Sequence, residues 1–509
     1  MTGKQIALTV AMSALMLLVL CAIAMSRGLN VDEHQFVASG ALLAREGFLP
    51  YRDYPFFHTP NLPLVYALLF RGTDYLLLSA RLLSVLCAFL GLIFISRAMW
   101  RSLSGHSGTF RVFITGSAAI LFFSNPVVLY SCWRAWNHPL ATLLATTAVL
   151  CLWRALDDRK SGRWYFAAGL LLSLAIGTRL TFAPLGLAFA GISLFLPAQI
   201  DIRTRMRNAL LLAAGGVIGA SPMLWLFALD ARAFIFNNFT WNGSISELYQ
   251  RAAVKYAGLG SKLFYIVTNV LRNPGNLALL LLFLTVQYAA LRQREFRRDP
   301  RNLLVLVSLP CLLIGALAPA VPYDQYFYEV VPFLVLGLVP PVVAFARAGG
   351  LDRSLCWGFG AAALISLFST GQDFRYMRKL ATPSRWTPIV LHRAGMELAQ
   401  IAGPGPVLTL APITPLEGRL RIYRALAASP YAWITAGFLS EEQRRQFGFI
   451  GQQNLASALE PRPPGAICTG SQRGNQRRAE ETMLLRYKDS LGYISFGLAN
   501  GETAWVSQH

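Results

Sequence analysis

The sequence is poor in charged residues, and above all in acids. Only 14% of its 509 residues are charged, and 25 Asp and Glu stand against 46 Lys and Arg. It has no Walker-type phosphate loop, no Gly-x-Ser-x-Gly elbow and no cysteine cluster, which argues against a nucleotide-driven pump, an esterase and an iron-sulfur protein. With 55% hydrophobic residues and a mean hydropathy of +0.46, the chain is too apolar for a soluble protein of this size. These values indicate a polytopic α-helical membrane protein.

Long apolar runs divide the first 370 residues. The first run, Ile6 to Met25, carries no charge and is long enough to cross about 30 Å of hydrocarbon. It is longer than the apolar core of a signal peptide, so we predict an uncleaved first helix. The whole pattern predicts about eleven transmembrane helices. They are expected near residues 6–26, 78–100, 110–130, 139–155, 164–177, 181–197, 209–229, 276–291, 303–320, 330–346 and 354–370.

Basic residues gather in every second loop. The clusters lie near residues 97–111, 154–163, 203–207, 292–301 and 347–353. The positive-inside rule makes these loops cytoplasmic, so the net charge of +21 records topology, and no nucleic-acid partner is expected. With Lys4 inside and an odd number of spans, the N-terminus is cytoplasmic and the C-terminus external. We therefore expect a multi-pass protein of the inner (plasma) membrane.

Two parts of the chain are expected outside the membrane in addition to short turns. The sequence predicts a transmembrane module over residues 1–370 with external loops at 27–79 and 230–276, followed by an external, periplasmic α/β domain over 371–509. In the tail, buried strands are expected at 406–410, 466–468, 493–496 and 503–506, and a polar helix at 441–447. In the first loop, 37–43 predicts an interfacial helix that stops at Gly47, and 56–70 a second helix along the surface. Cys132 and Cys468 are both expected on the external side, so a disulfide between them is possible.

An adjacent acid pair, Asp32-Glu33, follows the first span. Two carboxylates at the boundary of water and lipid are suited to chemistry, because desolvation raises one pKa while a neighbour keeps the other group ionised. A solvated acidic loop is the alternative explanation.

Further motifs accompany the acid pair at characteristic places. Pro50-Tyr51-Arg52-Asp53, Pro60-x-x-Pro63 and Arg81-Leu82-Leu83-Ser84 follow it, Gly177-Thr178-Arg179 ends a later span, and Tyr326 stands six residues before Pro332. In this order, the motifs resemble those of the GT-C membrane glycosyltransferases, particularly the protein O-mannosyltransferase and aminoarabinose-transferase branch. The family often has Lys-Pro-Pro where this chain reads His58-Thr59-Pro60, and many members have an Asp in the loop that here reads Arg134 to Pro139.

The resemblance implies transfer of a sugar from a polyprenyl-phosphate-linked donor to an envelope lipid, glycan or protein on the external face, with inversion at the anomeric carbon. Such a reaction needs a base, for which Asp32 is the first candidate, while Glu33 would tune its pKa or orient the acceptor. The departing phosphate needs a cation, and Arg179 occupies the family position for it. Arg52 and Arg134 are further candidates for this task. An arginine that reaches toward lipid headgroups is the alternative for Arg179.

Other polar residues of the external turns complete the predicted substrate site. They are Asp53, His58, Asn137, His138, Tyr326 and Glu329. The two histidines have no regular ligand spacing, so the sequence favours polar contacts and leaves a divalent metal open. The tyrosines of this region also fit an interfacial aromatic belt.

Two other classes of protein compete with the enzyme. A lipid or solute transporter or flippase would place ionisable residues in the middle of its spans and have related halves, whereas these spans are nearly free of acids and show no duplication. A non-catalytic membrane scaffold would leave the acid pair and Thr178-Arg179 unexplained. The sequence therefore favours an integral-membrane glycosyltransferase with membrane lipids around it.

Overall fold

The structure is a computed structural model that describes residues 3–157, 162–196, 200–251, 255–293, 296–347, 353–471, 475–487 and 492–507. Arg159, Lys160 and Arg294 of the predicted cytoplasmic clusters lie outside the described residues, as does the side chain of Lys4.

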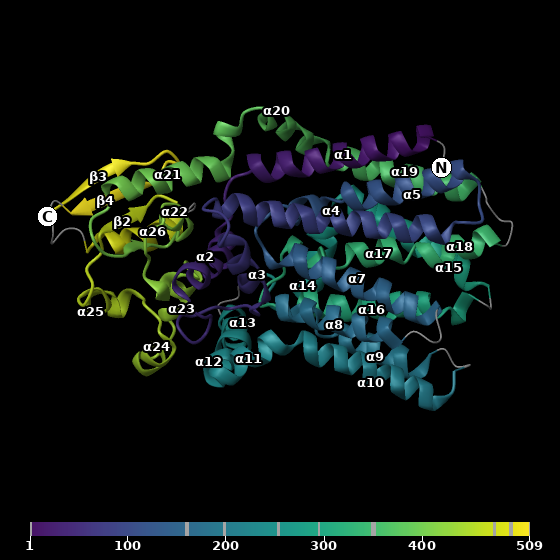
Figure 1. Cartoon of the computed structure of the whole chain (residues 1–509), viewed down its shortest axis with the longest axis horizontal. Coiled ribbons are helices and arrows are strands. Elements are labelled where there is room, and N and C mark those ends of the chain that lie inside the picture. Colours follow the sequence, from purple (N-terminus) through teal and green to yellow (C-terminus); the bar gives the residue numbers. More distant parts are fainter. Residues whose placement is uncertain are drawn as a thin grey trace.

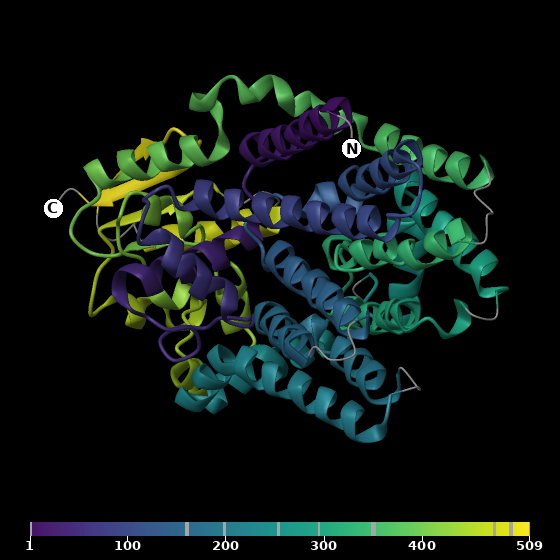
Figure 2. The same ribbon diagram turned by 45° about the vertical axis from the view of Figure 1, so that its right-hand side comes forward.

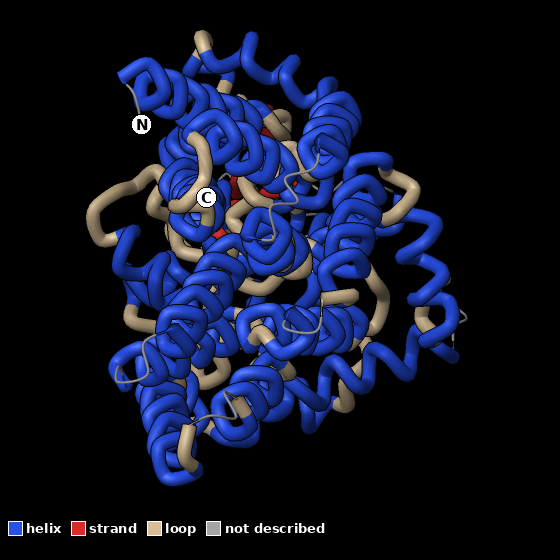
Figure 3. The backbone as a smooth tube through the Cα atoms, turned by 90° about the vertical axis from the view of Figure 1, so that its right-hand side faces the viewer, coloured by secondary structure: helices blue, strands red, loops and turns tan. Residues whose placement is uncertain are grey.

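Long helices run side by side, and the C-terminal sheet lies at one end of them (Figure 1). The helices of this bundle are α1 (Gly3–Ser26), α4 (Leu76–Ser102), α5 (Gly108–Phe123), α7 (Asn137–Asp157), α8 (Gly162–Thr178), α9 (Leu185–Phe195), α10 (Ile202–Gly219), α11 (Ser221–Leu229), α15 (Pro274–Leu291), α16 (Pro300–Leu317), α17 (Val331–Leu336), α18 (Val339–Arg347) and α19 (Arg353–Ser369). Figure 3 shows the bundle from the end opposite the sheet, with the strands behind the helices.

Short helices connect the long ones. They are α6 (Pro126–Ser131), η1 (Leu180–Phe182), α12 (Ala231–Ile235), η2 (Phe236–Thr240), α13 (Trp241–Arg251), α14 (Leu259–Tyr265), η3 (Ile266–Val270), η4 (Phe296–Arg298), η5 (Asp324–Phe327), η6 (Gly371–Tyr376), α20 (Met377–Leu380) and η7 (Pro383–Arg385).

Six segments of the described chain are long and apolar enough to cross a membrane. They are Gln5–Ser26, Leu76–Ser102, Asn137–Asp157, Pro274–Leu291, Pro300–Leu317 and Asp324–Ala346. Two bent pairs, α10 with α11 and α19 with the segment Gly371–Leu380, raise the number to eight if each pair is one span. The remaining predicted spans correspond to the shorter helices α5, α8 and α9, of 16, 17 and 11 residues. The prediction of a helical membrane protein is confirmed, and the number of eleven spans stays a prediction.

Both bent pairs turn by 51°. Between α10 and α11 the chain reads Gly219-Ala220-Ser221-Pro222, and Pro222 has no N–H to continue the hydrogen-bond ladder. An apolar run in the sequence therefore corresponds here to two helices with different directions.

The two ends of the bundle differ in what they carry. The start of α1 lies at the end of the bundle away from the sheet (Figures 1 and 2). The same end holds the ends of α7, α9, α15 and α18, next to which basic clusters lie in the sequence. The sheet and the first loop lie at the other end. This separation is the one that the positive-inside rule requires, and the assignment of the two ends to cytoplasm and exterior stays a prediction.

The first loop forms α2 (Val31–Glu46) and α3 (Asn61–Phe70). Asn30 and Glu33 form a capping box at the start of α2, and Gly47 ends it with a φ of 72°. Residues 33–42 are all buried, so the helix is covered by protein, and its position at the membrane interface stays a prediction. Helix α3 covers one side so closely that a Cβ on Gly40 would lie 2.4 Å from the Cβ of Tyr66.

The tail contains the predicted small sheet. Its strands are β1 (Val407–Thr409), β2 (Ala466–Thr469), β3 (Tyr493–Gly497) and β4 (Thr503–Ser507), in the order β1-β2-β4-β3, with β1 and β2 parallel and the other pairs antiparallel. The helices of the tail are α21 (Thr387–Ile401), α22 (Ile413–Glu417), η8 (Arg424–Leu426), α23 (Tyr431–Ala436), α24 (Glu441–Phe447), η9 (Gln452–Asn454), α25 (Leu455–Leu459) and α26 (Asn475–Leu485). The four expected strands and the polar helix are therefore present.

The tail is fastened to the bundle at the start of α4. The buried Glu417 carboxylate accepts a hydrogen bond from the Leu77 N–H at 2.8 Å and lies 2.8 Å from Nδ1 of His392. Arg419 adds an exposed ion pair with Asp74. Since the first N–H groups of a helix have no partner within it, Glu417 satisfies one that would otherwise be buried unpaired.

The two cysteines considered for a disulfide are free and buried. Cys132 lies in the core of the bundle, whereas Cys468 lies on β2 with its Sγ 3.2 Å from Oε2 of Glu502. The possible disulfide is therefore not formed, because the two thiols belong to different cores.

Candidate active site

Glu33 is held at the start of α2 by a buried ion pair. Its carboxylate accepts hydrogen bonds from Nε and Nη2 of Arg81 at 2.8 and 2.7 Å, and both side chains are fully buried. It also accepts from the N–H groups of Ala135 at 2.9 Å and Asn30 at 2.8 Å. Burial alone raises the pKa of Glu33, but the Arg81 charge and these donors outweigh it and hold the pKa below its usual value.

Arg81 also fixes the turn between α1 and α2. From α4 it donates to the carbonyl groups of Ala24, Arg27 and Gly28 at 2.7, 2.9 and 3.1 Å. The Arg81 guanidinium therefore holds Arg27 and Gly28 directly, and Asn30 through the Glu33 carboxylate. These contacts fix the backbone next to Asp32 and so the position of its carboxylate.

Asp32 is only partly buried and faces different partners from those of Glu33. Its carboxylate accepts a hydrogen bond from the hydroxyl of Tyr431, at the start of α23 in the tail. It also lies close enough to Tyr326 for an electrostatic interaction between the two side chains. The adjacent acids of the sequence thus have separate environments, one closed and one accessible.

Arg179 approaches Tyr326 from the end of α8. The centre of its guanidinium lies 4.9 Å from the Tyr326 ring, and the side chain is 6% exposed. Its Nη1 donates to Oδ1 of Asn137 at 3.3 Å, and its Nε lies 3.7 Å from Oε2 of Glu329, which also accepts from Thr181 at 3.0 Å. Nε of Arg179 has no hydrogen-bond partner within the described chain.

Arg134 lies in a box of aromatic rings. Its guanidinium is 3.9 Å from the ring centre of Tyr130, 4.4 Å from Trp136 and 4.9 Å from Trp133. The residue is 8% exposed, and Nε and Nη1 have no hydrogen-bond partner among the described residues. A buried cation without a carboxylate is costly, and an anionic ligand would offset that cost.

The two histidines of the predicted site, His58 and His138, both lie near Arg179. The ring of His138 stacks on Tyr326 at 6.0 Å, and neither of its nitrogens has a partner in the described part of the chain. His58 packs against Phe36 with 4.8 Å between ring centres. Burial and the nearby Arg179 charge lower the pKa of His58 to about 3, so its ring is neutral at physiological pH.

Two predicted residues do not join this group. Arg52 is exposed and pairs with its neighbour Asp53 at 2.7 Å. The Asp53 carboxylate also accepts from the Leu49 N–H at 2.8 Å and so closes the turn in which both residues lie. The pair therefore braces the first loop.

The described residues contain no group of three or more His, Cys, Asp or Glu side chains placed to hold a metal ion. The structure adds residues that the sequence did not suggest, namely Arg81, Tyr130, Thr181 and Tyr431. Arg81 was noted as part of a motif but not as the partner of Glu33. Tyr431 lies in a Ser-Pro-Tyr-Ala stretch with no recognisable local signal.

Comparison with solved structures identifies the fold. ArnT from Cupriavidus metallidurans bound to undecaprenyl phosphate is similar over 99% of this chain and 98% of its own, with 14% identity and a TM-score of 0.66. The chain has the GT-C fold. The apo state of the same protein gives 13% identity over 98% of this chain and 97% of that one, with a TM-score of 0.64. The predicted resemblance to GT-C proteins of the aminoarabinose-transferase type is thereby confirmed.

A more distant GT-C protein is also similar. The Archaeoglobus fulgidus oligosaccharyltransferase tethered with an acceptor peptide matches 98% of this chain and 74% of its own, with 12% identity and a TM-score of 0.50. No protein-family model matches the sequence, and no curated protein matches it significantly. The similarity is therefore found in the three-dimensional fold and not in the sequence comparisons.

Proposed function

We propose that this chain is a membrane glycosyltransferase that moves a sugar from a polyprenyl-phosphate donor to an acceptor at the end of the bundle that carries the sheet. Under this proposal that end is external, and the acceptor is an envelope lipid, glycan or protein. The likeness to ArnT, whose structure holds undecaprenyl phosphate, supports the choice of donor.

One observation carries the proposal. Buried nitrogen atoms of Arg134, His138 and Arg179 have no hydrogen-bond partners in the described chain. The ring of Tyr326 contacts Arg179 and His138 and also interacts electrostatically with Asp32. An arginine binds phosphate through two parallel N–H donors, and low exposure strengthens each contact. The arrangement thus offers a place for a leaving phosphate, with the Asp32 carboxylate as a base near the ring of Tyr326.

The reaction follows from this placement. A hydroxyl or amine of the acceptor attacks the anomeric carbon, and Asp32 accepts its proton as the new bond forms. The bond between the anomeric carbon and the phosphate oxygen breaks, and its electron pair leaves with the polyprenyl phosphate. Arg179 and Arg134 stabilise the negative charge that develops there. Attack from the side opposite the phosphate inverts the anomeric carbon.

Neighbouring groups position these reactants. Tyr431 holds the Asp32 carboxylate by its hydroxyl, and Glu329 with Asn137 holds the Arg179 guanidinium. We assign Glu33 a positioning role in place of a catalytic one, because all its contacts go to Arg81 and backbone N–H groups. Arg52 and Asp53 stay outside the proposed site.

The test separates donor binding from transfer. The full-length protein is placed in lipid vesicles with a polyprenyl-phosphate sugar and a membrane extract as acceptor, and release of polyprenyl phosphate is followed by mass spectrometry. Asp32→Asn should bind undecaprenyl phosphate like the wild type but lose roughly 10² to 10⁴ in transfer rate. Arg179→Gln should weaken binding of undecaprenyl phosphate.

Matched controls lie far from the proposed site. Asp157→Asn changes an acid at the other end of α7 whose side chain is 51% exposed, and Arg393→Gln changes an exposed arginine of α21. Both should match the wild type in binding and transfer. Full transfer by Asp32→Asn would overturn the assignment of the base. Wild-type binding of undecaprenyl phosphate by Arg179→Gln together with Arg134→Gln would overturn the phosphate site.

A further inference from the structure

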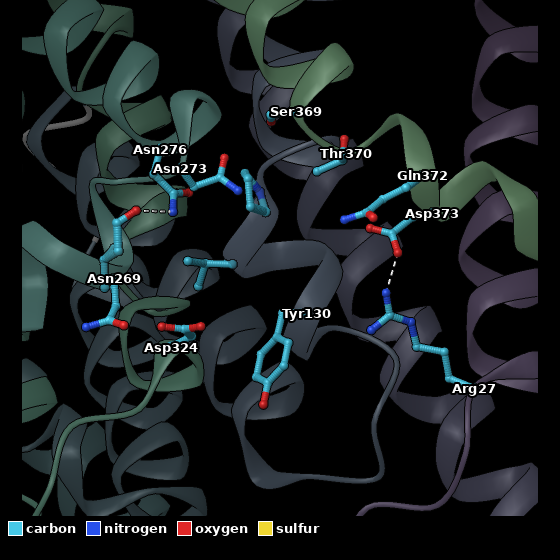
Figure 4. A pocket seen from close by; sticks show the side chains of 13 residues that line it. Arg27, Tyr130, Asn269, Asn273, Asn276, Asp324, Ser369, Thr370, Gln372 and Asp373 are labelled. Atoms are coloured by element: carbon cyan, nitrogen blue, oxygen red, sulfur yellow. Dashed lines mark hydrogen bonds and ion pairs between the residues drawn. The ribbon is translucent and has the colours of Figure 1, made fainter.

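A polar cavity lies beside the proposed phosphate site, where α1 and α19 end and α15 begins (Figure 4). Its volume is about 270 Å³. The polar residues that define its chemistry are Arg27, Asn269, Asn276, Asp324, Gln372 and Asp373. None of the residues assigned above to the donor site lines it.

The charges of the cavity exclude a phosphate ligand. The only guanidinium among its lining residues, that of Arg27, is paired with Asp373. Asp324 accepts a hydrogen bond from the Tyr265 hydroxyl at 2.7 Å and forms no ion pair within the described residues. The lining therefore carries one uncompensated carboxylate, which repels an anion.

Asn276 is one of the residues that line the cavity. Asn276 is 8% exposed, and its Nδ2 donates to the Val270 carbonyl at 2.7 Å, whereas its Oδ1 has no hydrogen-bond partner in the part of the chain that is described. Figure 4 shows Asn269, Asn276 and Asp324 on one side of the space and Gln372 and Asp373 on the other. The carboxylates and amides on the two sides can accept from or donate to the hydroxyl groups of one ligand.

The size and the walls of the cavity match one sugar ring. The cavity volume of about 270 Å³ lies just below the range of about 300 to 1,000 Å³ that is typical of pockets for drug-sized ligands, which suits one small polar unit. Amides and carboxylates accept from hydroxyl groups, and amides also donate to them. Tyr130 forms one wall and also covers the Arg134 guanidinium at 3.9 Å, so the cavity and the proposed phosphate site share a residue.

We infer that this cavity binds an uncharged sugar unit of the acceptor, beside the reaction centre and separate from the donor phosphate. The inference rests on the proposed function, which places the donor phosphate at Arg134 and Arg179. The proposed reaction needs the donor sugar between that phosphate and Asp32, and neither Asp32 nor Arg179 lines the cavity. The cavity is therefore available to a non-reacting unit of a glycan or glycolipid acceptor. Asp324 and Gln372 would bind its hydroxyl groups and so determine which acceptors fit.

The test uses simple sugars as probes. Methyl glycosides of neutral hexoses, glucosamine and inorganic phosphate are added to the full-length protein in lipid nanodiscs, and binding is measured by saturation-transfer NMR. Neutral glycosides should bind, and Asp324→Asn and Gln372→Ala should each weaken binding about tenfold, the effect of about 1.4 kcal/mol from lost hydrogen bonds. Gln372 is exposed, so its replacement leaves the fold intact. Asp157→Asn is the control and should bind like the wild type.

The outcomes separate this inference from the proposed function. Undecaprenyl phosphate binding is measured on the same samples, and Arg179→Gln should reduce it without changing binding of the glycosides. Absence of glycoside binding, or binding that both cavity variants retain, overturns the sugar site while donor binding still supports the enzyme. Binding of glucosamine alone would show that the cavity recognises a cation, and phosphate binding that Gln372→Ala abolishes would show an anion site. Either result overturns an uncharged sugar as the ligand.

Discussion

Replacing Arg81 with methionine leaves the Glu33 carboxylate buried without its partner. Both side chains are fully buried, and the guanidinium also holds three carbonyl groups of the turn between α1 and α2. Loss of one partner of a buried pair costs about 3 to 5 kcal/mol, because the remaining charge has no compensation. We expect Arg81→Met to lower the free energy of unfolding by about 4 kcal/mol.

A second variant tests the cause of this loss. Glu33→Gln with Arg81→Met has no buried charge, so it should be about 2 kcal/mol more stable than Arg81→Met alone. Unfolding is measured by SDS titration in mixed micelles, with the exposed Arg393→Met as a control that should stay within about 0.5 kcal/mol of the wild type. Wild-type stability of Arg81→Met, or a double variant less stable than the single one, would refute the reasoning.

The same pair predicts a dependence on pH. The pKa of Glu33 is lower in the folded protein than in the unfolded chain, so its contribution is complete above the unfolded value of about 4.3 and is lost as the pH falls through the folded value. The wild type should therefore lose stability in acid. The double variant should lack this part of the acid sensitivity.

Three further predictions concern other parts of the chain. A Cβ on Gly215 would lie 2.0 Å from a backbone oxygen of α8, so Gly215→Ala should destabilise the protein by about 1 to 3 kcal/mol in the same SDS titration. A Cβ on Gly216 has its nearest neighbour at 4.0 Å, so Gly216→Ala should leave the stability unchanged. Tyr431→Phe removes the hydroxyl that holds Asp32 and should lower kcat roughly tenfold without changing binding of undecaprenyl phosphate; an unchanged kcat would contradict the role of this contact. Burial raises the pKa of Glu502 from 4.5 to about 7, so stability should decline as the pH rises between these values, and Glu502→Gln should abolish the decline when thermal unfolding at pH 5 and pH 8 is compared.

Local sequence patterns were sufficient to predict most of the long helices and the four strands of the tail. The first apolar run corresponds to a helix that ends at Ser26. The short apolar run at β2 predicts a fully buried strand, and all residues of β2 are buried. Bends were missed because hydropathy does not report direction, as at Pro222. The burial of α2 was missed for another reason: its cover comes from α3 and from tail residues such as Leu416, far away in the sequence.

The division of labour between the two acids also exceeds what sequence can show. Glu33 meets Arg81, which is 48 positions away, whereas Asp32 meets Tyr431, which is 399 positions away. The spacing of adjacent residues on a helix predicts that they point in different directions but not what they meet there. His58, His138 and Arg179 come together for the same reason, through packing of three separate segments.

The contact between Asp32 and Tyr431 joins an early and a late part of the chain as it is synthesised. Asp32 leaves the ribosome early and Tyr431 late, and the Glu417 side chain that completes the start of α4 is also a late arrival. A nascent chain that has inserted all its apolar helices thus still has an unfinished reaction centre. Under the proposed function, a half-made copy in the membrane would lack the Tyr431 contact at Asp32 and would transfer sugar more slowly than the finished chain.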